Sequence, residues 1–246
     1  MTPLRPFLLS LSFAGLFLSL APTLLAQATQ VPAPEKGGKN TRDAVLAPIE
    51  DVAGLPRILL IGDSISMGYT IPTREALKGV ANVHRVPANA GSTVNGLESI
   101  DKWLATGGAD QKWDVIHFNW GLHDLKHYKD GKMVPGNPIW VSLADYEKNM
   151  RSLVQRLKKT GAKLIFATTT PVPEGAVGRD PGIEVKYNEA ALRVMKEEGV
   201  AIDDLHAFAA AKLAEIQLPK NVHFSPSGSK VLAEPVAASI KKALGK

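Results

Sequence analysis

Residues 57–64 read RILLIGDS, an apolar run that ends in a glycine, an aspartate and a serine. The apolar residues 58–61 show no alternation with polar ones, which is typical of a strand buried on both faces of a parallel sheet. Gly62 allows a sharp turn, and Ser64 would begin the next helix. This stretch therefore predicts a buried strand that leads directly into a helix, the repeating unit of an α/β fold.

Short apolar strands and amphipathic helices alternate from there to the C-terminus. We expect five βα units with right-handed crossovers, which form a three-layer α/β/α sandwich around a five-stranded parallel, flavodoxin-like sheet. In such a sheet the ligand site lies beyond the carboxyl ends of the strands, where the strand order reverses. The predicted strands are 57–61, 83–86, 115–119, 163–168 and 200–203, and the predicted helices are 74–78, 96–104, 142–160, 185–198, 205–216 and 226–244.

The N-terminus has the pattern of a secretory signal peptide. Arg5 precedes an apolar run, and the small residues Ala26 and Ala28 form an A-x-A cleavage site. A membrane anchor is the alternative, but Pro22 and the polar residues that follow keep the run below the ~20 residues of a span. We therefore predict a signal peptide at 1–28 and a secreted or periplasmic protein with no stable membrane insertion after cleavage.

The rest of the chain divides at about residue 57. Residues 29–56 are rich in Pro, Gly, Lys and Ala with little periodicity, which predicts a linker or leader that runs over the domain surface. Residues 57–246 form the predicted domain.

Composition excludes several classes of function. The 246 residues contain no cysteine, which rules out disulfides, thiolate catalysis, Cys-ligated zinc and iron–sulfur clusters. The net charge of +5 is spread along the chain, so nucleic acid is not an expected partner.

Polar residues follow the predicted strands. Ser64 can act as a nucleophile if a base reaches its hydroxyl, although Asp63 or Ser64 could also simply cap the helix. Gly91, after the second strand, can offer its backbone N–H to an oxyanion, or it can be a turn glycine. His223 lies on the loop that enters the last helix and is available as a base, although an isolated histidine is more often structural.

His123 and Asp124 follow the third strand in the sequence NWGLHD. Together with His127 they could be interpreted as a metal cluster, because histidines at i and i+4 share a helical face. No other ligand motif accompanies them, so we predict no metal site and no cofactor.

Taken together, these four segments resemble the SGNH/GDSL hydrolase family over residues 57–246. The resemblance rests on Gly62-Asp63-Ser64, Gly91, the segment 121–124 and His223, in the family's order and spacing. It implies the SGNH hydrolase fold with Ser64 and His223 as catalytic residues. It also implies an oxyanion hole of Ser64, Gly91 and His123, and a supporting structural role for Asp63 and Asp124.

Two positions depart from the family's pattern. His123 stands where the family has an oxyanion-binding Asn, and Lys220 stands where it has an Asp three residues before the histidine. A lysine cannot accept the imidazole N–H, so a backbone carbonyl or another carboxylate would have to orient His223. Asp203 and Asp204 are the nearest carboxylates in sequence, although they could also cap the following helix.

The resemblance implies a secreted serine esterase that hydrolyses short-chain, mainly O-acetyl, esters on a carbohydrate. The expected partner is a small ester or an acylated glycan. The alternatives are a catalytically silent carbohydrate-binding protein and an O-acyltransferase that uses the same Ser64 and His223. The sequence does not indicate the oligomeric state.

Overall fold

The computed structural model describes residues 39–106, 108 and 112–246. The predicted signal peptide, residues 1–28, and the first part of the predicted linker lie outside the described residues. Among the helices that are described, none is both long and apolar enough to cross a bilayer.

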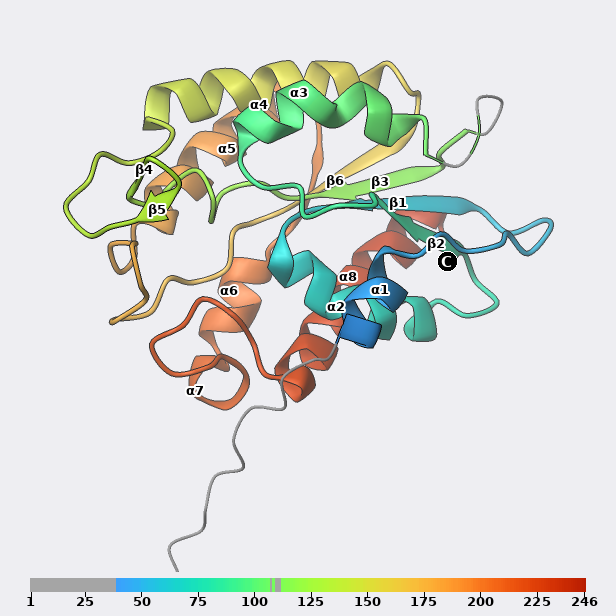
Figure 1. The fold of residues 1–246 in the computed structure, drawn as a ribbon. Helices are drawn as coiled ribbons and strands as arrows, with labels where there is room; N and C mark the ends of the chain where they lie inside the picture. Colours follow the sequence, from blue (N-terminus) through green and yellow to red (C-terminus); the bar gives the residue numbers. More distant parts are fainter. Residues whose placement is uncertain (1–38, 107, 109–111) are drawn as a thin grey trace, which may run out of the picture. The chain divides into compact units, whose positions relative to one another are not determined.

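A five-stranded parallel sheet in the order β2-β1-β3-β6-β7 forms the centre of the fold (Figure 1). The apolar residues of β1 are fully buried, as their sequence predicts. The strand order reverses at β1, because the chain adds β2 on one side of it and β3 on the other. The strands are β1 (Arg57–Ile61), β2 (Asn82–Arg85), β3 (Val115–Phe118), β6 (Lys163–Ala167) and β7 (Ala201–Asp203).

Helices cover both faces of this sheet, so the predicted three-layer sandwich is confirmed (Figure 1). One face carries α3, α4 and α5 packed side by side, and the other carries α2 against α8, with α1, α6 and α7 beside them. The helices are α1 (Lys39–Leu46), α2 (Ser64–Ala76), α3 (Thr93–Leu104), α4 (Leu143–Lys158), α5 (Glu184–Glu198), α6 (Leu205–Ala210), α7 (Leu213–Ile216) and α8 (Pro226–Leu244).

Several helix boundaries differ from the sequence predictions. α2 begins at Ser64, as the glycine-aspartate-serine turn predicts, and runs to Ala76, so the helical pattern at 74–78 marks only its end. Its interior contains Pro72, which disfavours helix locally, but extensive packing of α2 against α8 overrides that weak preference. The predicted helix at 205–216 divides into α6 and α7.

A small hairpin that the sequence analysis missed follows β3. It consists of β4 (Tyr128–Lys129) and β5 (Lys132–Met133), paired antiparallel. Asp130 and Gly131 connect them with φ angles of 51° and 79°. An Asp-Gly pair with two positive φ angles is a preferred two-residue hairpin turn, so the local signal was present in the sequence.

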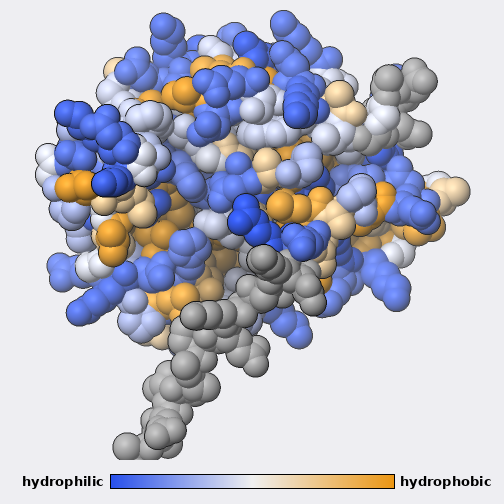
Figure 2. All heavy atoms as spheres, viewed as in Figure 1, coloured by the Kyte–Doolittle hydropathy of each residue, from blue (hydrophilic) through white to orange (hydrophobic). Residues whose placement is uncertain are grey.

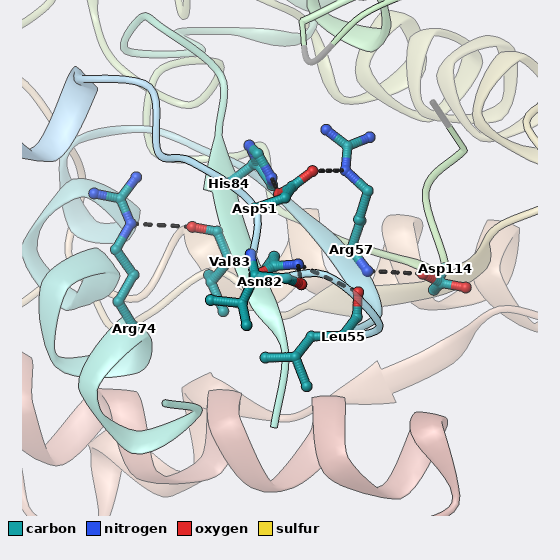
Figure 3. Close-up of polar contacts among 9 residues, drawn as sticks. Asp51, Leu55, Arg57, Arg74, Asn82, Val83, His84 and Asp114 are labelled. Carbon is teal, nitrogen blue, oxygen red and sulfur yellow. Dashed lines mark hydrogen bonds and ion pairs between the residues drawn. The ribbon is translucent and has the colours of Figure 1, made fainter. Parts of the chain in front are cut away.

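The described part of the predicted linker packs against the domain edge (Figure 3). The Asn82 side chain on β2 accepts the Val52 N–H at 2.9 Å and donates to the carbonyls of Val52 and Leu55. Asp51 accepts hydrogen bonds from Arg57 at 2.7 Å and pairs with His84 at 2.6 Å. Since β2 is an edge strand, these contacts cover an edge that would otherwise be open.

We expect the substitution Asn82→Ala to lower the free energy of unfolding by about 1–3 kcal/mol, because it leaves three backbone groups without partners. It should also accelerate cleavage after Glu50 by endoproteinase Glu-C, because it releases residues 48–56 from β2. Urea unfolding and timed proteolysis measure the two effects, with the exposed Lys78→Ala as a control. Unchanged proteolysis would show that Asn82 does not hold this segment.

Candidate active site

The segment that follows β1 forms a tight turn into α2. Asp63 is the N-cap of α2, and its carboxylate accepts the Ile65 N–H at 2.9 Å. A Cβ at Gly62 would lie 2.6 Å from the Ser66 Cβ, so only glycine fits there without displacing α2. Ser64 is therefore the first residue of the helix, beyond the carboxyl end of the strand at which the sheet order reverses.

Ser64 and His223, 159 residues apart in the chain, are in direct contact. The Ser64 Oγ lies 2.9 Å from the His223 Nε2. His223 occupies the loop before α8, where Ser225 is the N-cap and Pro226 the first helical residue, as predicted. The packing of α2 against α8 brings these two loop ends together.

The side chain of Asn221 orients the histidine. Its Oδ1 lies 2.8 Å from the His223 Nδ1 and 3.0 Å from the backbone N–H of His223. A carbonyl oxygen can only accept, so it places the ring proton on Nδ1 and leaves the Nε2 lone pair facing Ser64. Lys220 is exposed, with a φ of 55°. The sequence analysis overlooked this amide, two residues before the histidine.

The two carboxylates considered for this role are bonded elsewhere. Asp203 pairs with His117 at 2.9 Å in the interior. Asp204 is the N-cap of α6, where it accepts the Ala207 N–H and the Thr168 hydroxyl. The capping interpretation therefore holds for Asp204.

Ser64 and His223 line a cavity of about 400 Å³, together with His123, Lys126 and Arg179. Burial is the main cause that lowers the pKa of His223, and the charge of Arg179 lowers it further, against an opposing effect of Asp63. Burial likewise lowers the pKa of His123. Both rings are therefore neutral at neutral pH, and the Nε2 of His223 can accept a proton.

Of the residues predicted to bind an oxyanion, Ser64 and His123 line this cavity, and Gly91 lines a neighbouring one that His123 also borders. Gly91 has a φ of 63°, a conformation that favours glycine, and its N–H donates to the Asn89 Oδ1 at 3.0 Å. Asn89 would have to release this N–H before Gly91 could donate to an oxyanion. The His123 ring has no hydrogen-bond partner within the described residues, so its N–H is available. The Ser64 N–H belongs to the first turn of α2, where backbone donors lack intrahelical acceptors.

Asp124 connects the segment after β3 to the start of α3. Its Oδ1 accepts the Thr93 N–H at 2.8 Å and the Thr93 hydroxyl at 2.5 Å. Because this carboxyl is buried, its pKa is raised to about 7. Asp124 thus joins the His123 segment to the Gly91 segment.

Arg85, at the end of β2, donates hydrogen bonds to the turn between β1 and α2, which positions Ser64. Its guanidinium donates to the carbonyls of Gly62 at 2.7 Å and Asp63 at 3.2 Å, and to the Ser66 hydroxyl at 2.6 Å. Burial lowers its pKa to about 10, so it stays charged at neutral pH. The sequence analysis did not single out this arginine.

The described residues contain no group of three His, Cys, Asp or Glu side chains able to hold a metal ion. His127, the third member of the alternative metal cluster, bonds to the Asn137 carbonyl and to Asp180.

The raised pKa of Asp124 predicts a pH-dependent stability difference. Its folded-state pKa of about 7 exceeds the ordinary 3.8, so the folded protein holds a proton that the unfolded chain releases. The contribution of Asp124 to the free energy of unfolding therefore falls as the pH rises from 3.8 to about 7. Asparagine cannot ionise, so Asp124→Asn should gain stability relative to wild type between pH 5 and 8, by up to about 1.4 kcal/mol per pH unit. Urea unfolding of the wild type and of Asp124→Asn at pH 5 and at pH 8 measures this difference in stability, with the exposed Asp101→Asn as a control. A difference that is the same at both pH values would contradict the raised pKa.

The environment of His223 predicts its titration. We expect the imidazole resonances of His223 to titrate with a midpoint below 6.5 in NMR spectra, because burial and Arg179 disfavour the charged ring. Asn221→Asp should raise this midpoint, because a carboxylate on Nδ1 favours the imidazolium. A wild-type midpoint at or above 6.5 would refute the expected environment.

Comparisons with known proteins agree with this geometry. The model of the GDSL-like lipase/acylhydrolase family matches residues 60–231. A lipase/acylhydrolase from Enterococcus faecalis is similar in structure, with a TM-score of 0.64 and 18% identity over 76% of this chain and 96% of that one. The acetyl xylan esterase AlAXEase has a TM-score of 0.61 and 16% identity, over 75% of this chain and 99% of its own.

The acetylxylan esterase Axe2 from Geobacillus stearothermophilus has a TM-score of 0.57 and 20% identity, over 78% of this chain and 94% of its own. The search of curated protein sequences finds no match. The solved structures share the fold, and the family model spans well over half of the chain, including the segments that carry Ser64, Gly91, His123 and His223. The chain therefore belongs to the GDSL-like lipase/acylhydrolase family, the SGNH hydrolases, and is an ester hydrolase.

Proposed function

We propose that this protein is a secreted serine esterase that removes short acyl groups, chiefly acetyl, from a carbohydrate. The observation that carries the proposal is the 2.9 Å contact between the Ser64 Oγ and the His223 Nε2 at the carboxyl end of the sheet. The proposal of secretion rests on the signal-peptide pattern of residues 1–28.

In the proposed reaction, His223 removes the Ser64 proton as the Oγ attacks the ester carbonyl. The oxyanion of the tetrahedral intermediate is held by the Ser64 N–H, by the His123 ring N–H and by the Gly91 N–H once Asn89 has released it. His223 then protonates the leaving alcohol, and a water molecule activated by the same ring releases the acid from the acyl-enzyme.

Asn221 takes the position of the third catalytic group in this scheme. Its Oδ1 holds the tautomer and orientation that the reaction needs, but it carries no charge to stabilise the imidazolium. His223 can therefore act as a base while gaining less electrostatic support than a carboxylate would supply.

Two observations support acetylated carbohydrate as the substrate class. The cavity beside Ser64, at about 400 Å³, has room for a short acyl group together with part of a sugar. Two of the solved structures with the same fold are named acetyl xylan esterases. A transferase would use the same Ser64 and His223, and adding an acceptor sugar to the assay distinguishes transfer from hydrolysis.

Hydrolysis of p-nitrophenyl acetate by the mature chain tests the proposal. We expect Ser64→Ala to lower kcat by at least about 1,000-fold, because it removes the attacking atom. The control Ser152→Ala, on α4, should keep wild-type turnover. If turnover persists in Ser64→Ala, the serine mechanism is wrong. If the wild type shows none on this ester or on acetylated xylan, the carbohydrate-binding alternative takes its place.

A further inference from the structure

Two cations line the cavity that contains Ser64 and His223. Arg179 lines the cavity and donates its Nε to the Leu122 carbonyl at 2.8 Å and its Nη1 to the Val177 carbonyl at 3.4 Å. The Nζ of Lys126 lies 4.0 Å from the centre of the Tyr128 ring. Both side chains are half-buried, and both belong to segments that surround the β4–β5 hairpin.

These cations have no acidic partner in the part of the chain that the structure describes. No carboxylate there lies within 4.0 Å of Lys126 or Arg179. Asp63, the acidic residue in the cavity lining, uses one oxygen to cap α2, and Asp180 pairs with His127 instead. The site therefore holds two positive charges and the negative charge of Asp63 beside a neutral histidine, so positive charge is in excess.

This arrangement affects the proposed reaction directly. When His223 takes the Ser64 proton it becomes a cation, and Arg179 already disfavours that form of the ring. Asp63 favours the imidazolium, but the neutral Asn221 adds no further negative charge to offset the effect of Arg179. An anionic group of the substrate placed at Arg179 would offset it, and would bind more tightly for the same electrostatic reason.

From this geometry we propose that Lys126 and Arg179 form a carboxylate subsite, so that the substrate is an O-acetylated acidic glycan whose sugar carries a carboxylate near the ester. The inference rests on the proposed esterase function. An acetyl group is uncharged, so the anion must belong to the alcohol portion. The planar fork of arginine presents parallel N–H donors whose spacing matches the two oxygens of a carboxylate.

The rim of the cavity offers surface for the sugar itself. Trp140 is 45% exposed, and its ring packs edge-on against Tyr128 with the ring centres 5.0 Å apart. Met133, which lines the cavity, and Val134, which follows it in the chain, are also exposed. In Figure 2 hydrophobic atoms gather among hydrophilic ones at the left edge, where Figure 1 labels β4 and β5. Exposed aromatic and apolar side chains beside cations suit a flat, charged sugar.

The test compares hydrolysis of 3-acetoxybenzoate and 3-acetoxybenzamide, which share the acetyl group and differ in the charge of the alcohol portion. We expect wild-type kcat/KM to favour the carboxylate by about tenfold at low salt, with the preference shrinking as ionic strength rises. Arg179→Gln and Lys126→Gln should each reduce the ratio of the two kcat/KM values, and Arg179→Lys should retain part of it.

Lys242→Gln is the matched control, because it removes one positive charge about 24 Å along α8 from the start of that helix. Its ratio should equal that of the wild type. If Ser64-dependent hydrolysis shows equal kcat/KM for both esters, the carboxylate subsite is wrong while the esterase function stands. A preference that Arg179→Gln and Lys126→Gln leave intact also overturns the assignment of these residues.

A binding measurement separates the two proposals where neither ester is hydrolysed. Calorimetric titration of Ser64→Ala with trigalacturonate and with xylotriose should show binding of the acidic trisaccharide, weakened at least about tenfold by Arg179→Gln in the same background. That result supports the subsite even if the esterase assay fails. Equal affinities for the two sugars, or no binding of trigalacturonate, would overturn it.

Discussion

The geometry of the site depends on the hydrogen bonds that the buried side chain of Arg85 donates to the turn before Ser64. The guanidinium of Arg85 is enclosed beneath the turn between β1 and α2, where it donates to the carbonyls of Gly62 and Asp63 and to the Ser66 hydroxyl. A buried charge is costly unless polar groups surround it, and here the carbonyl dipoles of the turn provide much of that compensation. The position of Ser64 therefore depends on a residue from the neighbouring edge strand.

The general base, His223, comes from a segment 159 residues after Ser64 in the chain. His223 lies just before α8, and α8 packs along α2, the helix that begins with Ser64. Because both helices are anchored at the same edge of the sheet, their packing sets the 2.9 Å distance between the two reactive atoms. Asp124 joins two more strand ends by accepting both polar hydrogens of Thr93. The geometry of the site is thus a property of the sandwich as a whole.

The electrostatics of this site differ from what the family resemblance implies. An uncharged amide at Asn221 orients the histidine where a carboxylate is expected, and a neutral imidazole at His123 takes the place of an amide donor. Neither replacement adds negative charge, while Lys126 and Arg179 add two positive ones. Asp63 is the acidic residue in the cavity lining, and the proposed anionic group of the substrate would balance the remaining excess of positive charge.

The local sequence determined much of this protein. The apolar residues of β1, the glycine-aspartate-serine turn and the Ser-Pro start of α8 specify their structures through side-chain volume, capping and φ preference, which act over a few residues. These features were sufficient to predict the five-stranded parallel sheet, and the resemblance to the SGNH/GDSL family added the expectation that Ser64 pairs with His223.

Only the tertiary structure decided the rest. The continuation of α2 through Pro72 depends on packing against α8, and the role of Arg85 depends on the pairing of β2 with β1. The meeting of Lys126 and Arg179 at one cavity depends on a loop 53 residues away folding beside the hairpin. The choice of Asn221 over Asp203 or Asp204 depends on which side chains lie within 3 Å of the imidazole. Such contacts join residues that are distant in the chain, and no local preference of either partner encodes them.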